Sequence, residues 1–439
     1  MRVSVIGTGY LGAVHAACMA EIGHEVLGVD ADPEKVAGLA DGRAPFYEPG
    51  FDELLSRMVR SGRLRFGTSL AEAAESGDIH FICVGTPQMP DTGAADMSLV
   101  DSVIDELAPQ LRRGCLVVGK STVPVGTAER LRARIAELAP VGVAADLAWN
   151  PEFLSEGTAI KDTLQPDRLV VGTATAMADA VLRMVYAPIL VSGTPYVSTD
   201  LHTAELVKVS ANAMLATKIS FINAIADICD AVDADVVTLA EAIGLDSRIG
   251  PSSLAAGLGF GGGCLSKDIR ALKARAEELG VIDSLNFLRE IDELNIRRRR
   301  RTVDVARTLV DGSFADRNVA VLGVAFKPNT DDVRDSPALS VAVRIRHEGA
   351  TVRVHDPEAA SNARELFPDL DYATEPEKAC EGADVVLHLT EWAQYQAIDP
   401  AYLASVVRQP RIVDARNVLP LDRWRSAGWT IRGLGRAAS

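Results

Sequence analysis

The chain has 439 residues, of which 48% are hydrophobic and 24% charged, and its formal net charge is −15. This length suggests two or three domains, and the acidic balance argues against a nucleic-acid-binding protein. No apolar run reaches the roughly 18 residues of a membrane-spanning helix, and the opening residues lack the form of a signal peptide, so we expect a cytoplasmic protein that binds no membrane.

The first 30 residues read as strand, glycine-rich turn, helix and strand. Residues 3–7 form a short apolar run, residues 10–23 have helical periodicity that ends at Gly23, and residues 25–30 form a second apolar run. Helical patterns separate further predicted strands at 79–85, 115–121 and 146–150. This alternation predicts a parallel sheet with helices on both faces.

The pattern changes after residue 200. Residues 202–232 have apolar side chains at three- and four-residue spacing with no Gly or Pro, which predicts one long helix that bridges domains. A glycine-rich loop follows at 255–264. A second strand–turn–helix–strand unit begins at Arg317, with later strands at 383–392 and 411–417. We therefore predict an α/β protein with two Rossmann-like, doubly wound domains joined by a long central helix.

A Gly-x-Gly-x-x-Gly motif follows the first predicted strand. Gly7 permits a tight turn, Gly9 allows a pyrophosphate to approach the backbone, and Gly12 lets the helix pack on the strand. Asp30 ends the second strand, where its carboxylate can bond the ribose hydroxyls and would repel a 2′-phosphate. The motif predicts binding of NAD rather than NADP; the alternative is a glycine-rich turn in an unrelated α/β protein.

Three other segments have the composition of a ligand site. Residues 83–87 and 121–123 each follow a predicted strand, where ligands bind in this architecture, although ordinary turns are the alternative. Glu152 and Glu156 are four residues apart, so on a helical turn both side chains would face one side. There they could place a general base or orient a water. The alternative is that they are acidic residues at a helix N-terminus, where the helix dipole stabilises negative charge.

Cys264 differs from the other five cysteines, for which we expect small buried side chains in a reducing compartment. Three glycines precede it and would let a bulky ligand approach the thiol. A helical pattern follows, and a thiol near a helix N-terminus is stabilised as the reactive thiolate. Lys267 adds positive charge and Asp268 could accept a proton. The alternative is a structural cysteine beside a flexible loop.

The second Rossmann-like half lacks the glycine motif, since Gly323 stands alone after its first strand. This half therefore need not bind a dinucleotide. Lys327 and Arg334 instead supply charge for a phosphate or a carboxylate. Five consecutive arginines at 297–301 are spread around a predicted helix, so we interpret them as a solvated helix face.

Together these motifs resemble the UDP-glucose/GDP-mannose dehydrogenase family. The resemblance spans the whole chain and rests on the order of seven motifs: GTGYLG, CVGTP, STVPVGT, NPEFLSEG, ELVKVSAN, GFGGGCLSKD and AFKPNTDD-x-RDSP. It implies an NAD-binding domain at 1–200, a central helical domain with the cysteine loop at 201–312, and a UDP-sugar-binding domain at 313–439. It also implies a homodimer built on the long helix.

The family reaction is a four-electron oxidation of a sugar C6 alcohol to the acid with two NAD in succession. The resemblance implies that Cys264 is the nucleophile and carries the thiohemiacetal and thioester intermediates. Lys208 would stabilise oxyanions and Asn212 would bond the intermediate. Asp268 would assist proton removal, and Glu152 and Thr122 would position or activate water. Whether the base is Lys208, Asp268 or a water between them stays open.

The resemblance also implies two sets of binding residues. The cofactor set is Gly7, Gly9, Tyr10, Leu11, Gly12, Asp30, Lys35, Val84, Gly85, Thr86, Pro87, Ser121, Thr122, Glu156, Lys267 and Arg334. The substrate set is Glu152, Phe153, Leu154, Lys208, Asn212, Arg248, Phe260, Gly261, Lys327 and Arg416, with Arg248 reaching the neighbouring subunit's substrate.

The cysteine loop GLGFGGGC is most similar to the UDP-glucose branch of the family, which predicts UDP-glucose as substrate and UDP-glucuronate as product. Three alternatives stay open. The same chemistry could act on GDP-mannose or a UDP-N-acetylhexosamine. A two-electron dehydrogenase of the 6-phosphogluconate type shares the first domain but needs no thiol. A non-catalytic NAD-binding scaffold would have no reason to retain Cys264, Lys208 and Asp268 together.

Overall fold

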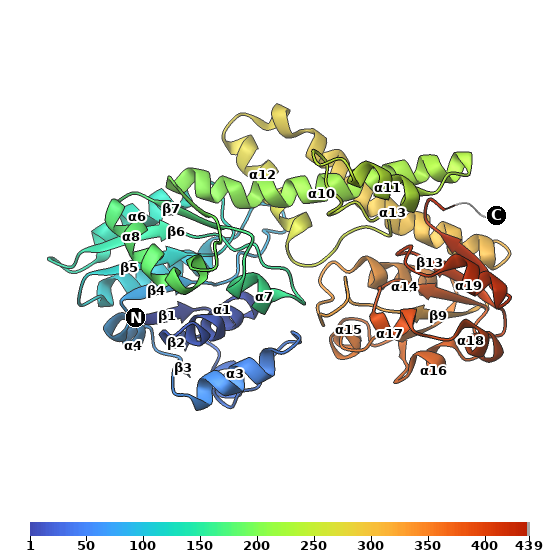
Figure 1. The fold of residues 1–439 in the computed structure, drawn as a ribbon, viewed down its shortest axis with the longest axis horizontal. Coiled ribbons are helices and arrows are strands. Elements are labelled where there is room, and N and C mark those ends of the chain that lie inside the picture. Colours follow the sequence, from blue (N-terminus) through green and yellow to red (C-terminus); the bar gives the residue numbers. More distant parts are fainter. Residues whose placement is uncertain (437–439) are drawn as a thin grey trace. The chain divides into compact units, whose positions relative to one another are not determined.

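The computed structural model of the chain describes residues 1–436, which fold as two compact units. Unit 1 comprises Met1–Ala211 and Arg270–Ile282, and unit 2 comprises Asn212–Ile269 and the described residues from Asp283 onward. Each unit contains one sheet flanked by helices (Figure 1). The predicted fold class of two doubly wound domains and a long central helix is confirmed. The three-domain boundaries at residues 200 and 312 stay predictions.

The sheet of unit 1 has eight strands in the order β3-β2-β1-β4-β5-β6-β7-β8. All neighbours are parallel except β6 and β7. Strands β3, β7 and β8 were not predicted, and β8 has an exposed, weakly apolar pattern. The bounds are β1 Arg2–Ile6, β2 Glu25–Val29, β3 Leu64–Gly67, β4 Ile79–Ile82, β5 Cys115–Gly119, β6 Ala145–Trp149, β7 Leu169–Thr173 and β8 Tyr196–Thr199.

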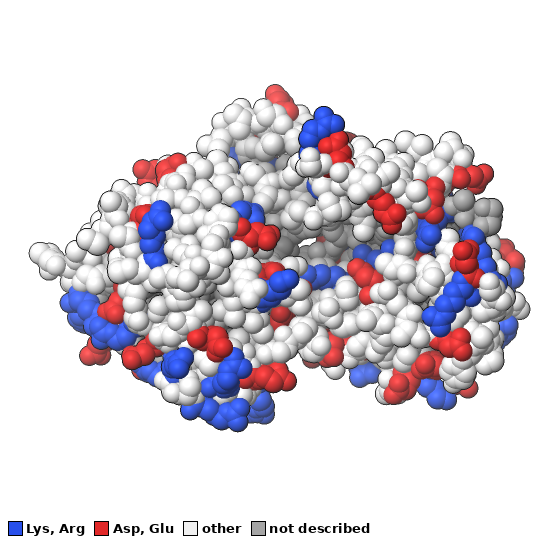
Figure 2. Space-filling view, in the orientation of Figure 1, with Lys and Arg blue, Asp and Glu red and all other residues white. Residues whose placement is uncertain are grey.

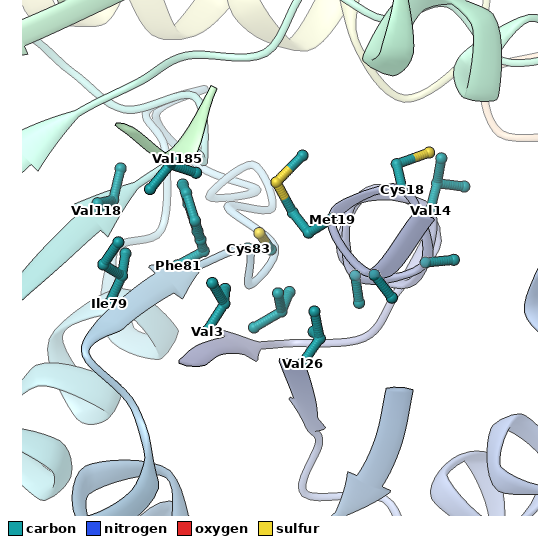
Figure 3. Packing of buried hydrophobic residues seen from close by; sticks show 14 of the residues in the cluster. Val3, Val14, Cys18, Met19, Val26, Ile79, Phe81, Cys83, Val118 and Val185 are labelled. Atoms are coloured by element: carbon teal, nitrogen blue, oxygen red, sulfur yellow. The ribbon is translucent and has the colours of Figure 1, made fainter. Parts of the chain in front are cut away.

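The helices of unit 1 cover both faces of this sheet. The first ends where the sequence predicts, because Gly23 adopts the left-handed φ of +104° just after the helix. The buried cluster in Figure 3 packs Val14 and Met19 of this helix against Val3, Val26 and Phe81 of the strands. The bounds are α1 Tyr10–Glu21, α2 Pro33–Ala40, α3 Phe51–Arg60, α4 Leu70–Ser76, α5 Ser98–Leu107, α6 Thr127–Leu138, α7 Ala159–Leu164, α8 Ala176–Val185 and α9 Ala187–Leu190.

The long helix α10 runs over Leu201–Val232, as the absence of Gly and Pro predicts. Its first 11 residues belong to unit 1 and the rest to unit 2. Three helices follow in the chain: α11 Val236–Gly244, α12 Leu265–Glu278 and α13 Phe287–Leu309. Among residues 1–436, none of the helices is sufficiently long and apolar to span a membrane.

The sheet of unit 2 has six parallel strands in the order β11-β10-β9-β12-β13-β14. The predicted strands that begin this half are β9 and β10, and the later two are β12 and β13. The strand bounds are β9 Asn318–Leu322, β10 Thr351–His355, β11 Asp371–Tyr372, β12 Val385–His388, β13 Arg411–Asp414 and β14 Thr430–Gly433. The helix bounds are α14 Pro337–His347, α15 Ala360–Leu366, α16 Pro376–Cys380, α17 Ala393–Gln396, α18 Pro400–Val406 and α19 Leu421–Ser426.

The arginine run on α13 is a solvated face only in part: Arg297, Arg300 and Arg301 are exposed, whereas the other two are not. The Arg298 side chain is only 1% exposed, pairs with Asp227 and donates through Nε to the Gly257 carbonyl at 3.1 Å. Arg299 is also mostly buried and pairs with Asp335 at 2.8 Å. The helix turns successive arginines in different directions, and two of them face the protein. Elsewhere, on the face in Figure 2, acidic and basic side chains are interspersed.

The exposure of the six cysteines separates Cys264 from the other five, as expected. Cys18, Cys83, Cys229 and Cys380 are buried, Cys115 is partly buried, and Cys264 is exposed. Burial raises the pKa of Cys83 and of Cys380 to about 12, so these thiols stay protonated and act as small core side chains. Cys264 is therefore the cysteine that is accessible for chemistry among the six.

Candidate active site

The glycine turn of unit 1 has the geometry that its motif predicts. Gly7 adopts a left-handed φ of +89°. A Cβ on Gly12 would lie 1.8 Å from the Gly7 carbonyl oxygen, so helix α1 can pack here only without a side chain. A Cβ on Gly9 would meet nothing within 4 Å. The space over Gly9 is thus open to a ligand, and Tyr10 and Leu11 follow as the first residues of α1.

Asp30 lies beside this turn at the end of β2. Its Oδ2 accepts the Thr8 N–H at 2.8 Å, and Lys35 Nζ lies 3.1 Å away. Burial acts to raise the pKa of Asp30, but the backbone N–H groups of Asp32 and Thr8 and the Lys35 ammonium outweigh it and hold the pKa below its ordinary value. Asp30 is therefore a carboxylate at neutral pH and can accept bonds from ribose hydroxyls.

The loops after β4 and β5 are bonded to each other. Ser121 Oγ donates to the Val84 carbonyl at 2.6 Å, and Thr86 Oγ1 donates to the Thr122 carbonyl at 2.8 Å. A Cβ on Gly85 would meet nothing within 4 Å, and Pro87 continues this loop. These loops leave the carboxyl ends of parallel strands, as the first glycine turn does. The turn, Asp30 and the two loops fit a bound dinucleotide.

The Glu152–Glu156 segment is not helical, so the prediction that both carboxylates share a helical turn is wrong. Helix α7 begins only at Ala159. Glu152 Oε2 accepts the Leu154 N–H at 2.8 Å, which bends the chain away from helix. Glu152 Oε1 pairs with the buried Lys208 Nζ at 3.0 Å. Phe153 lies beside this pair, with the Lys208 ammonium 5.6 Å from its ring centroid.

Glu48 is a buried carboxylate that the sequence analysis did not single out. Its Oε2 accepts the Gly157 N–H at 2.5 Å, its Oε1 accepts the Ala159 N–H at 2.7 Å, and Tyr10 Oη donates to it. Burial, then the bond to Glu48, and then the Glu156 charge raise the pKa of Tyr10. Glu48 thus ties the glycine turn to the Glu152–Gly157 segment. The neighbouring sequence, FYEPG, contains no motif that predicts this contact.

Unit 2 contains the cysteine and its polar neighbours. Cys264 immediately precedes α12, and its carbonyl accepts the Asp268 N–H at 2.9 Å, which closes the first helical turn. Asp268 is buried; its Oδ2 accepts Asn212 Nδ2 at 2.6 Å, and its Oδ1 pairs with Lys267 Nζ at 2.7 Å. The structure therefore brings together the thiol turn, a carboxylate, an amide and an ammonium, all from predicted positions.

The glycines before Cys264 are required by the chain's own packing. A Cβ on Gly261 would lie 2.5 Å from the Asp335 carbonyl oxygen, and one on Gly262 would lie 2.8 Å from the Phe326 ring. Asn295 holds the preceding residue by two bonds, since Oδ1 accepts the Phe260 N–H at 2.8 Å and Nδ2 donates to its carbonyl at 2.9 Å. The loop is thus packed against Asp335 and Phe326 and bonded to the Asn295 side chain.

Two predicted basic residues lie near this loop within unit 2. Arg334 is bonded to the Asp332 carboxylate through Nε and Nη2, the latter at 2.7 Å, and its guanidinium lies against Gly263, where a Cβ would approach it to 2.8 Å. Lys327 Nζ lies 5.5 Å from the Phe326 ring centroid. Both side chains keep partial access to solvent. Their predicted roles toward cofactor and substrate stay predictions.

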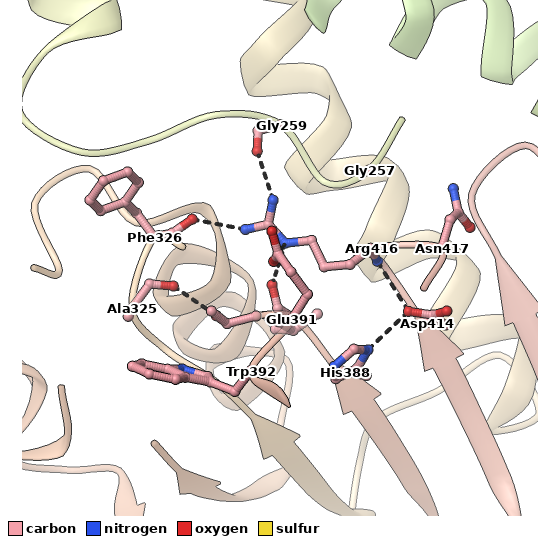
Figure 4. A network of polar contacts seen from close by, with 12 residues as sticks. Gly257, Gly259, Ala325, Phe326, His388, Glu391, Trp392, Asp414, Arg416 and Asn417 are labelled. Carbon is pink, nitrogen blue, oxygen red and sulfur yellow. Dashed lines mark hydrogen bonds and ion pairs between the residues drawn. The ribbon is translucent and has the colours of Figure 1, made fainter. Parts of the chain in front are cut away.

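Arg416 is bonded to three backbone carbonyls (Figure 4). Nε donates to Leu389 O at 2.7 Å, Nη2 to Phe326 O at 2.9 Å and Nη1 to Gly259 O at 3.4 Å. The guanidinium thus joins the cysteine loop to the loops after β9 and β12. Arg248 behaves differently: its exposed side chain pairs only with the nearby Asp246, at 2.6 Å, among the bonds described.

Comparison with known proteins decides the family. The family models of the UDP-glucose/GDP-mannose dehydrogenases match three parts of the chain: the NAD binding domain at residues 1–190, the central domain at 202–297 and the UDP binding domain at 320–421. The chain belongs to the UDP-glucose/GDP-mannose dehydrogenase family. It is therefore an NAD-dependent oxidoreductase, as the motifs predict.

Members of this family resemble the chain over its whole length. It is 41% identical to a UDP-glucose 6-dehydrogenase of Rhizobium meliloti, over 99% of this chain and 100% of that one. The solved UDP-glucose dehydrogenase of Pyrobaculum islandicum has a TM-score of 0.91 and 38% identity, and covers 99% of this chain and 98% of its own. A UDP-D-ManNAc dehydrogenase of Pyrococcus horikoshii has a TM-score of 0.85 and 27% identity over all of both chains.

Proposed function

We propose that the protein oxidises UDP-glucose to UDP-glucuronate with NAD, through covalent intermediates on Cys264. One observation carries the covalent part: the exposed Cys264 lies at the start of α12, one turn from the bonded Asn212–Asp268–Lys267 group. The choice of sugar rests on the higher identity to UDP-glucose dehydrogenases than to the UDP-D-ManNAc enzyme, 38% against 27%.

Unit 1 would hold NAD through the Gly7–Gly12 turn, with Asp30 on the ribose and the loops after β4 and β5 beside it. Lys35 would steady Asp30, and Glu156 would lie toward the cofactor. Bound NAD supplies a hydride acceptor, which no side chain of the protein can replace. Glu152, fixed by Leu154 and Lys208, would orient the hydrolytic water together with Thr122.

In unit 2 the thiolate of Cys264 would attack the C6 aldehyde that the first oxidation produces, giving a thiohemiacetal. The second oxidation converts this adduct to a thioester, and water releases the uronate. The start of a helix favours the thiolate because its backbone dipole is positive there. Asp268 would assist proton removal while Asn212 bonds the intermediate, and Lys208 would stabilise the oxyanions. Lys327, Phe260, Gly261 and Arg416 would hold the substrate.

The stoichiometry of NADH tests the reaction. Purified protein is supplied with limiting UDP-glucose and excess NAD, and NADH is counted per sugar consumed. A ratio near two supports the proposal, whereas a ratio near one indicates a two-electron dehydrogenase. No NADH from UDP-glucose contradicts the choice of sugar, and parallel assays with GDP-mannose and UDP-N-acetylhexosamines then separate another sugar from a scaffold.

The covalent step is tested by Cys264→Ser, with Cys115→Ser as the matched control, since Cys115 lies in β5 outside the cysteine loop. A serine hydroxyl is not ionised at neutral pH, so we expect acid formation to fall by about 10³-fold or more. The control should keep wild-type turnover. Mass spectrometry of the quenched wild-type enzyme should find the sugar on the peptide that contains Cys264. Full turnover by Cys264→Ser would rule out the covalent mechanism.

We also propose that the protein is a homodimer built on α10. Met214, Phe221 and Ile228 are spaced seven residues apart on this helix, and each is more than half exposed. Side chains at that spacing form one apolar stripe, which a second copy of the same helix can cover. Arg248 is exposed and would reach the substrate of the neighbouring subunit. The predicted cytoplasmic location stays a prediction.

Light scattering and subunit mixing test this arrangement. Phe221→Asp should convert a dimer to a monomer, whereas Val141→Asp, at an exposed loop position, should not. If Arg248 acts across the interface, inactive Arg248→Ala and Cys264→Ser subunits should regain part of the activity when mixed, because one hybrid site contains both native residues. A monomeric wild-type protein would contradict the dimer, and mixtures without activity would contradict the role of Arg248.

A further inference from the structure

The three glycines before Cys264 lie between two fixed parts of the chain. Glycine has more backbone freedom than any other residue, so three in succession do not by themselves hold a neighbouring thiol in one place. After the glycines, the Cys264 carbonyl accepts the Asp268 N–H at 2.9 Å, which joins the thiol to the first turn of α12. Among the glycines, the Gly262 N–H donates to the Arg334 carbonyl at 2.9 Å. Phe260 comes directly before them, so the group that holds Phe260 fixes where the glycine run begins.

Asn295 of α13 is the side chain that holds Phe260. It is 1% exposed; its Oδ1 accepts the Phe260 N–H at 2.8 Å, and its Nδ2 donates to the Phe260 carbonyl at 2.9 Å. One amide thus satisfies both backbone groups of one residue, as a neighbouring strand would. Gly259 leaves the space for this amide, because it has a left-handed φ of +103° and a Cβ on it would overlap Asn295 Oδ1. The amide and the glycine are therefore sterically matched.

Other buried side chains hold the residues that come earlier in the same loop. Arg298, the next buried polar residue along α13, donates through Nε to the Gly257 carbonyl at 3.1 Å. Asn223 of α10 accepts the Gly257 N–H through Oδ1 at 2.9 Å. Asn417 donates through Nδ2 to the Ala256 carbonyl at 3.1 Å. The approach to the glycine run is therefore anchored from α10, α13 and the segment after β13, and the anchor nearest to the thiol is the amide on α13.

We propose that Asn295 is a positioning residue for the covalent steps: its amide fixes Phe260 and, through the glycine run, holds the Cys264 thiol where the sugar aldehyde is attacked. This inference rests on the proposed function, in which Cys264 is the nucleophile. The first oxidation, from alcohol to aldehyde, forms no bond to the thiol, whereas the second begins from the thiohemiacetal. Loss of the amide should therefore impair the second oxidation more than the first.

Two reactions of the same aldehyde separate the position of the thiol from the amount of folded enzyme. The 6-aldehyde of UDP-glucose is supplied with NADH, which reduces it to the alcohol without the thiol, or with NAD, which oxidises it to the acid through the Cys264 adduct. In Asn295→Ala the kcat for oxidation should fall by about 10²-fold, the effect of a displacement of about 1 Å, and the kcat for reduction by less than about threefold. Equal losses in both directions would indicate only a structural role and overturn the proposal.

Two further variants separate the hydrogen bonds from the general stability of α13. Asn295→Leu nearly keeps the shape of the side chain and removes both bonds to Phe260, so it should show the same unequal loss as Asn295→Ala. Thr302→Val is the matched control: Thr302 is buried on α13, and its Oγ1 donates at 3.0 Å to the Arg298 carbonyl of the same helix. Its ratio of oxidation to reduction should equal that of the wild type. An unchanged ratio in Asn295→Leu, or an equally altered one in Thr302→Val, overturns the proposal.

Alkylation of the resting enzyme tests the position of the thiol without sugar or NAD. Iodoacetamide reacts with the thiolate, which the start of a helix stabilises. In Asn295→Leu the alkylation rate of Cys264, followed by mass spectrometry of its peptide, should fall by about threefold or more, because the thiol is no longer held at the start of α12. Thr302→Val should react at the wild-type rate. An undiminished rate in Asn295→Leu overturns the inference. If the wild type oxidises no nucleotide sugar, the proposed function fails, whereas the alkylation rates still decide whether Asn295 positions the thiol.

Discussion

The two units begin with the same local structure, used in two ways. In each, a strand ends in a left-handed glycine, Gly7 with φ of +89° and Gly323 with φ of +95°. Each glycine N–H donates at 2.8 Å to the backbone carbonyl of the last residue of the next strand. An acidic residue follows that carbonyl directly in the chain. That residue is Asp30 in unit 1 and Asp356 in unit 2, and its side chain accepts an N–H from the turn.

The surroundings of the two carboxylates differ. Helix α1 begins three residues after Gly7, and Asp30 keeps partial exposure beside Lys35. In unit 2 helix α14 begins only at Pro337, after a long loop, and Asp356 is 4% exposed. Asp356 Oδ2 accepts the N–H groups of Val324 and Ala325, at 2.7 and 2.9 Å, and lies 3.4 Å from Trp392 Nε1.

The comparison shows that the turn and the acid are not by themselves a dinucleotide site. In unit 1 the short glycine turn leaves the carboxylate accessible, so it can bond a ribose. In unit 2 the corresponding carboxylate, that of Asp356, is bonded by backbone and indole donors and stabilises the fold. The buried Asp356, whose carboxylate is occupied by these donors, agrees with the prediction that the second half need not bind a dinucleotide.

The largest expected effect is at Gly12. Its Cβ would lie 1.8 Å from a backbone carbonyl oxygen, which cannot move aside, so Gly12→Ala should destabilise the protein by about 3 kcal/mol and abolish NAD binding. Gly9→Ala meets open space and should fold normally, but its methyl group should reduce NAD affinity by about tenfold or more. Urea unfolding and calorimetric titration with NAD separate the two. Equal losses of stability in both variants would contradict this contrast.

Asp356→Asn should come next, with a loss of about 2 kcal/mol of unfolding free energy, because one amide oxygen must replace a carboxylate that accepts several donors. Urea unfolding measures the loss. NAD affinity should be unchanged within about twofold. A fall in NAD affinity without a fall in stability would show that the second unit binds the dinucleotide, contrary to the comparison.

Asp30→Asn should show the opposite pattern, with about tenfold weaker NAD binding and a stability loss of only about 1 kcal/mol at pH 7. Since the folded protein holds the pKa of Asp30 below its ordinary value of 3.8, the carboxylate stabilises the fold above that value. The stability difference between wild type and variant should shrink as pH falls through the folded pKa. A difference that persists unchanged in acid would contradict this linkage.

The smallest effect is expected in the cysteine loop of unit 2. Gly263→Ser places its Cβ against the guanidinium of Arg334, the mobile end of a long side chain, and should cost less than about 0.5 kcal/mol. Gly261→Ser meets the Asp335 carbonyl at 2.5 Å and should cost about 2 kcal/mol or more. Thermal unfolding of the two variants, side by side, measures the contrast. A larger loss for Gly263→Ser would show that Arg334 is held more firmly than its exposure suggests.

Much of the fold was predictable because it depends on local patterns. Period-two and buried apolar runs located most central strands, and the absence of Gly and Pro predicted α10. The missed strands β3, β8 and β11 lie at sheet edges and are short or weakly apolar, so their sequences resemble loops, whereas β7 was missed although its run is apolar, buried and inside the sheet. The glycine turn was predictable for a steric reason, since its spacing is dictated by positive φ and by the close contact of Gly12 with Gly7.

The contacts between residues far apart in the sequence depend on the tertiary fold. The local sequence was sufficient to identify which side chains could carry chemistry: the thiol of Cys264 before a helix, Asp30 after a strand, and the charges around them. It could not show that Glu48 holds the Gly157 backbone, that Arg298 is buried, or that the buried Lys120 bonds Asn150. Burial and charge pairing depend on which segments pack together, and that packing has no signature in a local window of sequence.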